Sequence, residues 1–213
     1  MLYKSTKNFL LTAFAFIVLI PCSIVVLGTF KTDAEIYSTP LALPKNWTLD
    51  NFRTLFDSGG LITPFKNSVI VAVFSVFITL ILASMAAYAI ARSITISGKV
   101  LFFLFTLGLA IPGQVNIIPI YVLFVKLNLN NSLTGLVLVN IALTLPISIF
   151  ILSAFFKDLS REMFEAASID GAGHWRIFRS IALPLCRPAM GATGIFLFVI
   201  CWNDLLYPLM LIS

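Results

Sequence analysis

Five long apolar runs separate the polar segments of the chain. They cover residues 9–30, 67–91, 100–125, 133–156 and 188–213, and only the last contains an acidic or basic side chain, Asp204. A helix needs about 20 apolar residues to cross the hydrocarbon core of a bilayer, where the backbone must satisfy its own hydrogen bonds. The pattern therefore predicts an all-α, polytopic transmembrane helical bundle that forms a single domain over residues 1–213.

The first apolar run follows two basic residues, Lys4 and Lys7, as a secretory signal would. Its length exceeds the ~7–15 apolar residues of a signal sequence, and no small-residue cleavage pattern follows Phe30. We expect a retained membrane anchor.

The overall composition agrees with membrane insertion. Hydrophobic residues make up 60% of the 213-residue chain, charged residues 11%, and the mean hydropathy is +1.03. Soluble domains have about 45–50% apolar and about 25% charged residues. The net charge of +5 does not indicate nucleic-acid binding, because the basic residues flank the apolar runs.

The distribution of basic residues predicts the orientation, since loops rich in Lys and Arg resist translocation. With the N-terminus in the cytoplasm, nine of the fourteen Lys and Arg residues lie inside, where the net charge is +5, and the outside has a net charge of zero. The outer loop at 31–66 contains turn residues and is expected to form a packed cap.

The second long loop, at 157–187, is then cytoplasmic. Ser160 is a candidate N-cap for a first helix, and Gly171 and Gly173 would end that helix. A second helix is expected from His174 to Ala182, with an apolar stripe and a stop at Pro184. The members of that stripe are Trp175, Phe178, Ala182 and Leu185.

This loop contains a motif with fixed spacing. Glu165-Ala166-Ala167 is followed by Gly171 and, nine residues later, by Ile181-Ala182-Leu183-Pro184. The pattern resembles the signature of the membrane subunits of binding-protein-dependent ABC importers. Three further elements resemble the carbohydrate branch of that family, of the maltose-type second permease: Ile169 to Ala172, the Ile-Pro pairs at 111–112 and 118–119, and Trp202-Asn203-Asp204. Ser160 departs from the resemblance, because that branch usually has proline there.

The resemblance implies a type I ABC importer permease fold in a bacterial inner membrane. It also implies that the cytoplasmic loop is a coupling helix that inserts into a separate, dimeric ABC ATPase. The implied coupling residues are Glu165, Ala166, Ala167, Asp170 and Gly171. Further implied partners are a second homologous permease subunit, an extracytoplasmic solute-binding protein and a sugar substrate. This chain is not expected to hydrolyse ATP, because Ser93 and Val100 interrupt the only approach to a phosphate-binding loop.

Polar side chains inside the apolar runs are candidates for the translocation pathway, because polar groups at membrane depth must be paired or hydrated. They are Gln114, Asn116, Asn140, Asn203 and Asp204. Gln114 and Asn116 follow Ile111-Pro112-Gly113, where a kink is expected. Interhelical hydrogen bonding is the alternative for the amides. Asp204 is expected near the outer end or facing water, because a charge at the membrane centre costs about 2.5–3.5 kcal/mol.

No metal site or cofactor is expected, because the one histidine and the three cysteines lack ligand spacing. The family has six spans, so the resemblance also predicts that a last span is missing from this sequence. Two alternatives stay open: an importer of the same type for a non-sugar solute, and an intramembrane enzyme. The spans offer no convergent nucleophile and base for the second.

Overall fold

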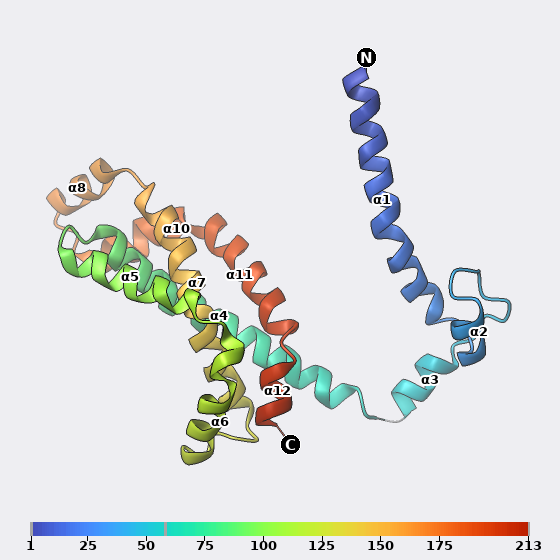
Figure 1. The fold of residues 1–213 in the computed structure, drawn as a ribbon. Helices are drawn as coiled ribbons and strands as arrows, with labels where there is room; N and C mark the ends of the chain where they lie inside the picture. The colour runs from blue at the N-terminus through green and yellow to red at the C-terminus, as the bar shows by residue number, and fades with distance from the viewer. Residues whose placement is uncertain (1, 58, 213) are drawn as a thin grey trace. The chain divides into compact units, whose positions relative to one another are not determined.

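The computed structural model describes residues 2–57 and 59–212, and all regular structure in these ranges is helical. The chain divides into two compact units, residues 1–65 and 66–213. Figure 1 shows the helices in chain order. The first unit contains α1 (Leu2–Gly28), α2 (Asp33–Ser38) and α3 (Asp50–Asp57).

The segment after α1 folds on itself through one buried lysine. Lys31 is 1% exposed, and its Nζ donates hydrogen bonds to the carbonyl oxygens of Thr39 at 2.7 Å and Pro40 at 3.0 Å. The side-chain amide of Asn51 donates to the carbonyls of Thr29 and Lys31. These hydrogen bonds satisfy backbone carbonyl groups in the segment that contains the short helices α2 and α3.

The second unit is built around α7 (Leu133–Lys157). Helices α5 (Ile96–Ala110) and α11 (Arg187–Trp202) pack against it. Gly108 of α5 allows close approach, since a Cβ there would lie 3.2 Å from Cγ of Pro146. α4 (Ile62–Arg92) contacts α7 through the hydroxyls of Thr79 and Thr144, 3.2 Å apart.

Two of the apolar runs are not straight helices. The run at 100–125 divides into α5, a 3-10 turn at Gly113–Asn116 and α6 (Ile117–Lys126), with a bend of 86°. Ile111 is extended, with φ −94° and ψ 113°, as the residue before a proline usually is. The kink expected at Ile111-Pro112-Gly113 is therefore present.

The last run also differs from one continuous helix. It forms α11 and α12 (Leu206–Leu211), with residues 203–205 between them. Pro208 has no N–H to bond to the carbonyl of Asp204, and its ring would clash with that carbonyl in a continuous helix. A proline lies close to each interruption, whereas α7 remains continuous through Pro146.

By length and composition, three helices can cross a membrane: Thr6–Gly28 of α1, α4 and α7. Two bent pairs raise this number to five if each pair is one span. The second pair joins the helix at His174–Leu185 to α11 at 72°. These statements apply to the described residues. Each of the five predicted apolar runs overlaps one of these helices or pairs, and the last run continues beyond Trp202 into α12.

Candidate functional site

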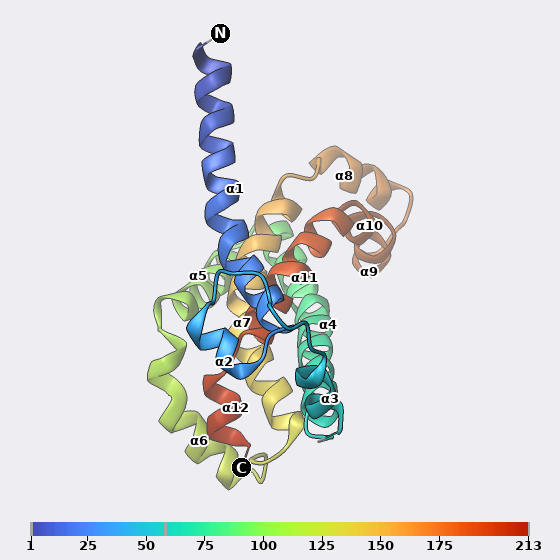
Figure 2. The same ribbon diagram turned by 90° about the vertical axis from the view of Figure 1, so that its right-hand side faces the viewer.

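The loop between α7 and α11 forms a helical hairpin at one end of the second unit. Its first arm is α8 (Arg161–Ile169), and its second arm is continuous from α9 (His174–Ile177) through a π-helical segment (Phe178–Ala182) to α10 (Leu183–Leu185). Figures 1 and 2 show this hairpin at the end opposite α6 and α12. We call residues 161–185 the coupling hairpin, after the role that the sequence resemblance led us to expect.

A glycine closes the first arm. Gly171 has φ +80°, its N–H donates to the carbonyl of Ser168 at 3.1 Å, and the N–H of Ala172 donates to the carbonyl of Ala167 at 3.0 Å. These two bonds define a Schellman motif, in which a left-handed residue follows the helix. Glycine adopts this conformation without the steric cost that a Cβ would add.

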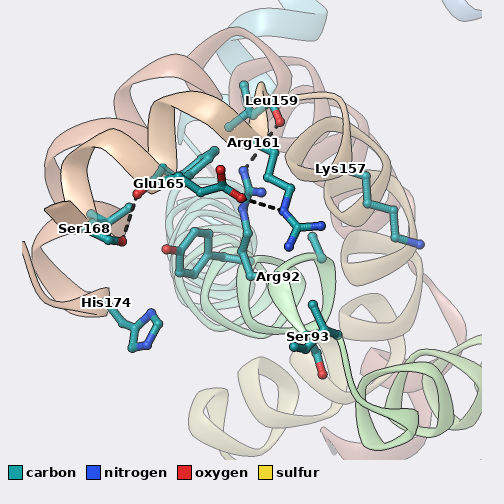
Figure 3. Close-up of a pocket in the computed structure, with 13 residues that line it drawn as sticks. Arg92, Ser93, Lys157, Leu159, Arg161, Glu165, Ser168 and His174 are labelled. Carbon is teal, nitrogen blue, oxygen red and sulfur yellow. Dashed lines mark hydrogen bonds and ion pairs between the residues drawn. The ribbon is translucent and has the colours of Figure 1, made fainter.

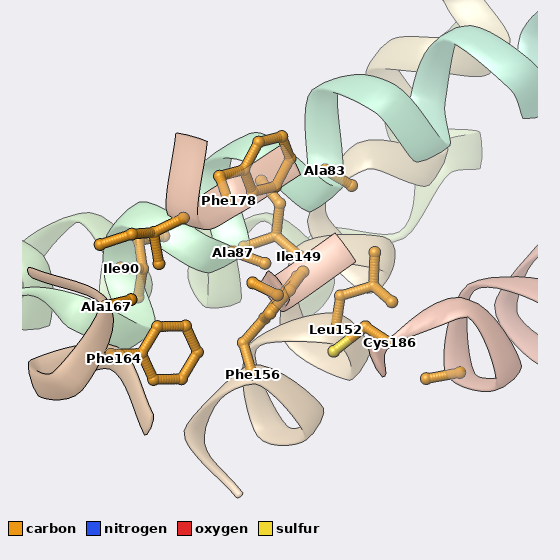
Figure 4. Packing of buried hydrophobic residues seen from close by; sticks show 13 residues of the cluster. Ala83, Ala87, Ile90, Ile149, Leu152, Phe156, Phe164, Ala167, Phe178 and Cys186 are labelled. Carbon is orange, nitrogen blue, oxygen red and sulfur yellow. The ribbon is translucent and has the colours of Figure 1, made fainter. Parts of the chain in front are cut away.

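One face of α8 is packed on the ends of α4 and α7. Phe164 is 6% exposed and Ala167 is 9% exposed, and both belong to a cluster with residues of α4, α7 and the second arm. Figure 4 shows this cluster. The ring of Tyr88 lies 5.8 Å from Phe156, 6.3 Å from Phe164 and 5.2 Å from Phe178. The hairpin is therefore joined to the bundle by aromatic packing.

The opposite face of α8 is exposed. Glu165, Ala166 and Asp170 lie on the surface, and Ile169 is 86% exposed. Glu165 accepts a hydrogen bond at 3.0 Å from Nε of Arg161. Both side chains are largely exposed, and such helical pairs contribute only about 0.3–0.5 kcal/mol. Glu165 can therefore exchange this partner for another cation at little cost.

The structure places the five candidate coupling residues on two sides of the hairpin. Glu165, Ala166 and Asp170 face outward, and Gly171 forms the turn. Ala167 faces the bundle, so its small side chain allows α8 to approach the bundle. That burial differs from the contact with another protein that the sequence led us to expect for both alanines.

Three local expectations for the hairpin have mixed outcomes. Ser160 is the N-cap residue of α8, as expected, but its side chain makes no capping hydrogen bond. The second arm continues past Pro184 to Leu185, because a helix tolerates proline in its first turn and the π segment has already shifted the hydrogen-bond register. The expected stripe is only half buried, since Trp175 is 61% exposed and Leu185 is 50% exposed.

A second candidate site is a cavity of about 550 Å³ near the break between α5 and α6. The structure brings four of the five candidate pathway residues to its wall. These are Gln114, Asn116, Asn140 and Asp204. They come from the 3-10 turn, from α7 and from the interruption between α11 and α12, so both helix breaks contribute polar groups to one space.

The fifth candidate, Asn203, is not part of this wall. Its side-chain amide donates to the carbonyl of Val199 in its own helix at 2.8 Å. Thr144 and Tyr207 do line the cavity, and sequence reasoning missed both. The hydroxyl of Tyr207 donates to the carbonyl of Gly113 at 2.7 Å, which satisfies a backbone group released at the kink. The kink expected at Ile111-Pro112-Gly113 indicates that a carbonyl there loses its helical partner. The sequence does not show which residue bonds to that carbonyl, because Tyr207 lies 94 positions away.

Sequence reasoning also missed Arg92 at the coupling hairpin. The guanidinium carbon of Arg92 lies 3.4 Å from the ring centroid of Phe164, and its Nη2 lies 3.5 Å from the carbonyl oxygen of Leu159. Figure 3 shows Arg92 between α4 and α8. Arg92 directly follows the apolar run at 67–91, and this position alone does not predict either contact.

The chain is similar to known proteins in sequence and in fold. Residues 79–213 match the family described as "Binding-protein-dependent transport system inner membrane component". The chain is 34% identical over 209 residues to the diacetylchitobiose uptake system permease protein NgcG of Streptomyces coelicolor, covering 98% of this chain and 69% of the relative. It is 34% identical over 203 residues to the arabinooligosaccharides transport system permease protein AraQ of Halalkalibacterium halodurans, covering 93% and 72%.

A solved structure has the same fold. The crystal structure of a bacterial ABC transporter involved in the import of the acidic polysaccharide alginate contains a chain that matches with a TM-score of 0.88 at 20% identity, covering 100% of this chain and 75% of that one. The fold is thus that of an ABC importer permease. Together with the family match over the hairpin, the second cavity and α11, this shows that the chain belongs to the inner membrane components of binding-protein-dependent transport systems.

Proposed function

We propose that this chain is a membrane subunit of an ATP-driven sugar or oligosaccharide importer and that the coupling hairpin connects it to a separate ATPase. The observation that carries the proposal is the two-sided character of α8. Its inner face, with Phe164 and Ala167, is joined to the ends of α4 and α7, and its outer face, with Glu165 and Ile169, is exposed. A force applied to the outer face would therefore reach two long helices directly.

The proposed assembly contains this chain, a second homologous permease subunit, a dimeric ABC ATPase and an extracytoplasmic solute-binding protein. The N-terminus lies in the cytoplasm, which places the coupling hairpin on the side of the ATPase. The relatives named for oligosaccharide uptake support sugar as the cargo class. Transport proceeds by alternating access when closure of the ATPase dimer moves the hairpin.

The outer face of α8 gives the sharpest test of coupling. Glu165→Gln removes the carboxylate that would exchange Arg161 for a cationic group on the ATPase. Glu162→Gln is a matched control on an exposed first-turn residue. In the reconstituted complex, Glu165→Gln is expected to lower the stimulation of ATP hydrolysis by the loaded binding protein, and Glu162→Gln is not. Unchanged stimulation in Glu165→Gln, with normal membrane insertion, would contradict the coupling role.

We propose further that the cavity of about 550 Å³ forms this chain's part of the translocation pathway. Its amides and the Asp204 carboxylate offer the hydrogen-bonding groups that a hydroxyl-rich cargo would need. Asn116→Ala is expected to reduce uptake of labelled sugar without changing the stimulation of ATP hydrolysis. Asn8→Ala, an exposed amide on α1, serves as the control. Equal uptake by Asn116→Ala and the unmodified protein would remove the cavity from the pathway.

The second candidate function is import of a non-sugar solute by the same assembly, since the hairpin does not contact the cargo. Uptake measured with a panel of labelled sugars and labelled amino acids separates the two. Accumulation of amino acids but no sugar, dependent on this chain, would overturn the sugar assignment and leave the coupling role in place.

A further inference from the structure

A cavity of about 470 Å³ lies beside the coupling hairpin and carries an excess of positive charge. It is walled by the end of α4, the end of α7 and both arms of the hairpin. Arg92, Lys157 and Arg161 line it, against one carboxylate, that of Glu165. Figure 3 shows these side chains around the opening.

The one carboxylate does not neutralise this charge. Glu165 is held by Arg161 at 3.0 Å, and the positive charges of Arg92 and Arg161 repel each other. The buried Nε of Arg92 has no hydrogen-bond partner among the described residues. The Arg92 side chain also lines the cavity, and a planar guanidinium is well suited to a phosphate oxygen.

The surroundings of the cavity are apolar. Ile94, in the connection from α4 to α5, is 84% exposed, and Ile96, the first residue of α5, is 80% exposed. Nζ of Lys157 lies 4.5 Å from the ring centroid of Phe102. Cationic groups thus stand next to apolar side chains at the ends of membrane-spanning helices. Basic pockets between such helices bind the headgroups of anionic lipids.

We infer that this cavity binds the phosphodiester headgroup of an anionic phospholipid, with the acyl chains along the exposed isoleucines. The inference uses the proposed function only to place the cavity at the inner leaflet. A bound phosphate would pair with Arg92 and Arg161 together and would leave Glu165 free to turn to the ATPase. Lipid composition would in this way set how readily the hairpin engages its motor.

The test is native mass spectrometry of the full chain purified in detergent, with phosphatidylglycerol or phosphatidylcholine added to the micelles. The unmodified protein is expected to retain phosphatidylglycerol in preference to phosphatidylcholine. Arg161→Gln is expected to weaken retention about five-fold, the equivalent of about 1 kcal/mol for one basic residue near an anionic lipid. Arg179→Gln removes the same charge from an exposed position outside the cavity and is expected to have no such effect.

Other outcomes would overturn the inference. Equal weakening by Arg179→Gln would indicate a general attraction to the basic surface. Displacement of the lipid by equal concentrations of glycerol phosphate or inorganic phosphate would indicate a site for a small soluble anion. Release of the lipid on adding the ATPase subunit would assign the cavity to an acidic side chain of that subunit. ATPase stimulation in Glu165→Gln is a separate measurement, so failure of the lipid site and failure of the coupling role are distinguishable.

Discussion

Replacing Phe164 by alanine should detach the coupling hairpin from the bundle. The ring is 6% exposed, lies under the guanidinium of Arg92 at 3.4 Å and is 6.3 Å from the ring of Tyr88. Truncation of a buried phenylalanine costs about 3–5 kcal/mol. We take the lower value, about 3 kcal/mol, because α8 lies at the edge of the cluster; at 1.4 kcal/mol per factor of ten, this shifts the equilibrium between docked and detached hairpin by about 100-fold.

The assay is hydrogen–deuterium exchange of the backbone amides of residues 164–172 in the purified protein. Phe164→Ala is expected to speed exchange in this segment and to leave the amides of the central part of α7 protected. Ile169→Ala is the matched control, because Ile169 is apolar, lies on the same helix and is 86% exposed. Unchanged exchange in Phe164→Ala, or equal acceleration in both variants, would refute the idea that this ring holds the hairpin.

Three further substitutions test separate contacts. Gly171→Ala should destabilise the hairpin turn by about 1–2 kcal/mol because φ is +80° there, whereas Gly173→Ala, with φ −71°, should not; exchange at the turn reads out both. A double-mutant cycle of Thr79→Val and Thr144→Val, followed by thermal unfolding in detergent, should give a coupling energy of about 0.6 kcal/mol, and zero coupling would remove the interhelical hydrogen bond. Tyr207→Phe should lower the unfolding free energy by about 1 kcal/mol in the same assay, because it strands a carbonyl at the helix break; no change would mean that water replaces the hydroxyl.

Much of the fold follows from local patterns that can be recognised in the sequence. The apolar runs become the long helices. Pro112 ends α5 because proline has no N–H to donate and because the residue before it, Ile111, is extended. Gly171 was identified as a turn residue for the conformation that it adopts. Each of these effects depends on neighbours within a few residues.

The contacts that assemble the candidate sites depend on residues far apart in the chain. Arg92 and Phe164 are 72 positions apart, and Tyr207 and Gly113 are 94 apart. Ala166 and Ala167 are identical in type and adjacent, yet one is exposed and the other is buried, because the packing of α8 on α4 decides which side faces inward.

Site-directed crosslinking tests the central claim most directly. Ala166→Cys places a thiol on the outer face of α8, and Ala167→Cys places one on the neighbouring inward face; Cys22, the exposed native cysteine, is replaced by serine in both. In membranes containing the assembled transporter, Ala166→Cys should crosslink to the nucleotide-hydrolysing subunit, and Ala167→Cys should not. Labelling of Ala166→Cys by a membrane-impermeant reagent from the extracytoplasmic side, or the absence of any crosslink to that subunit, would contradict the account.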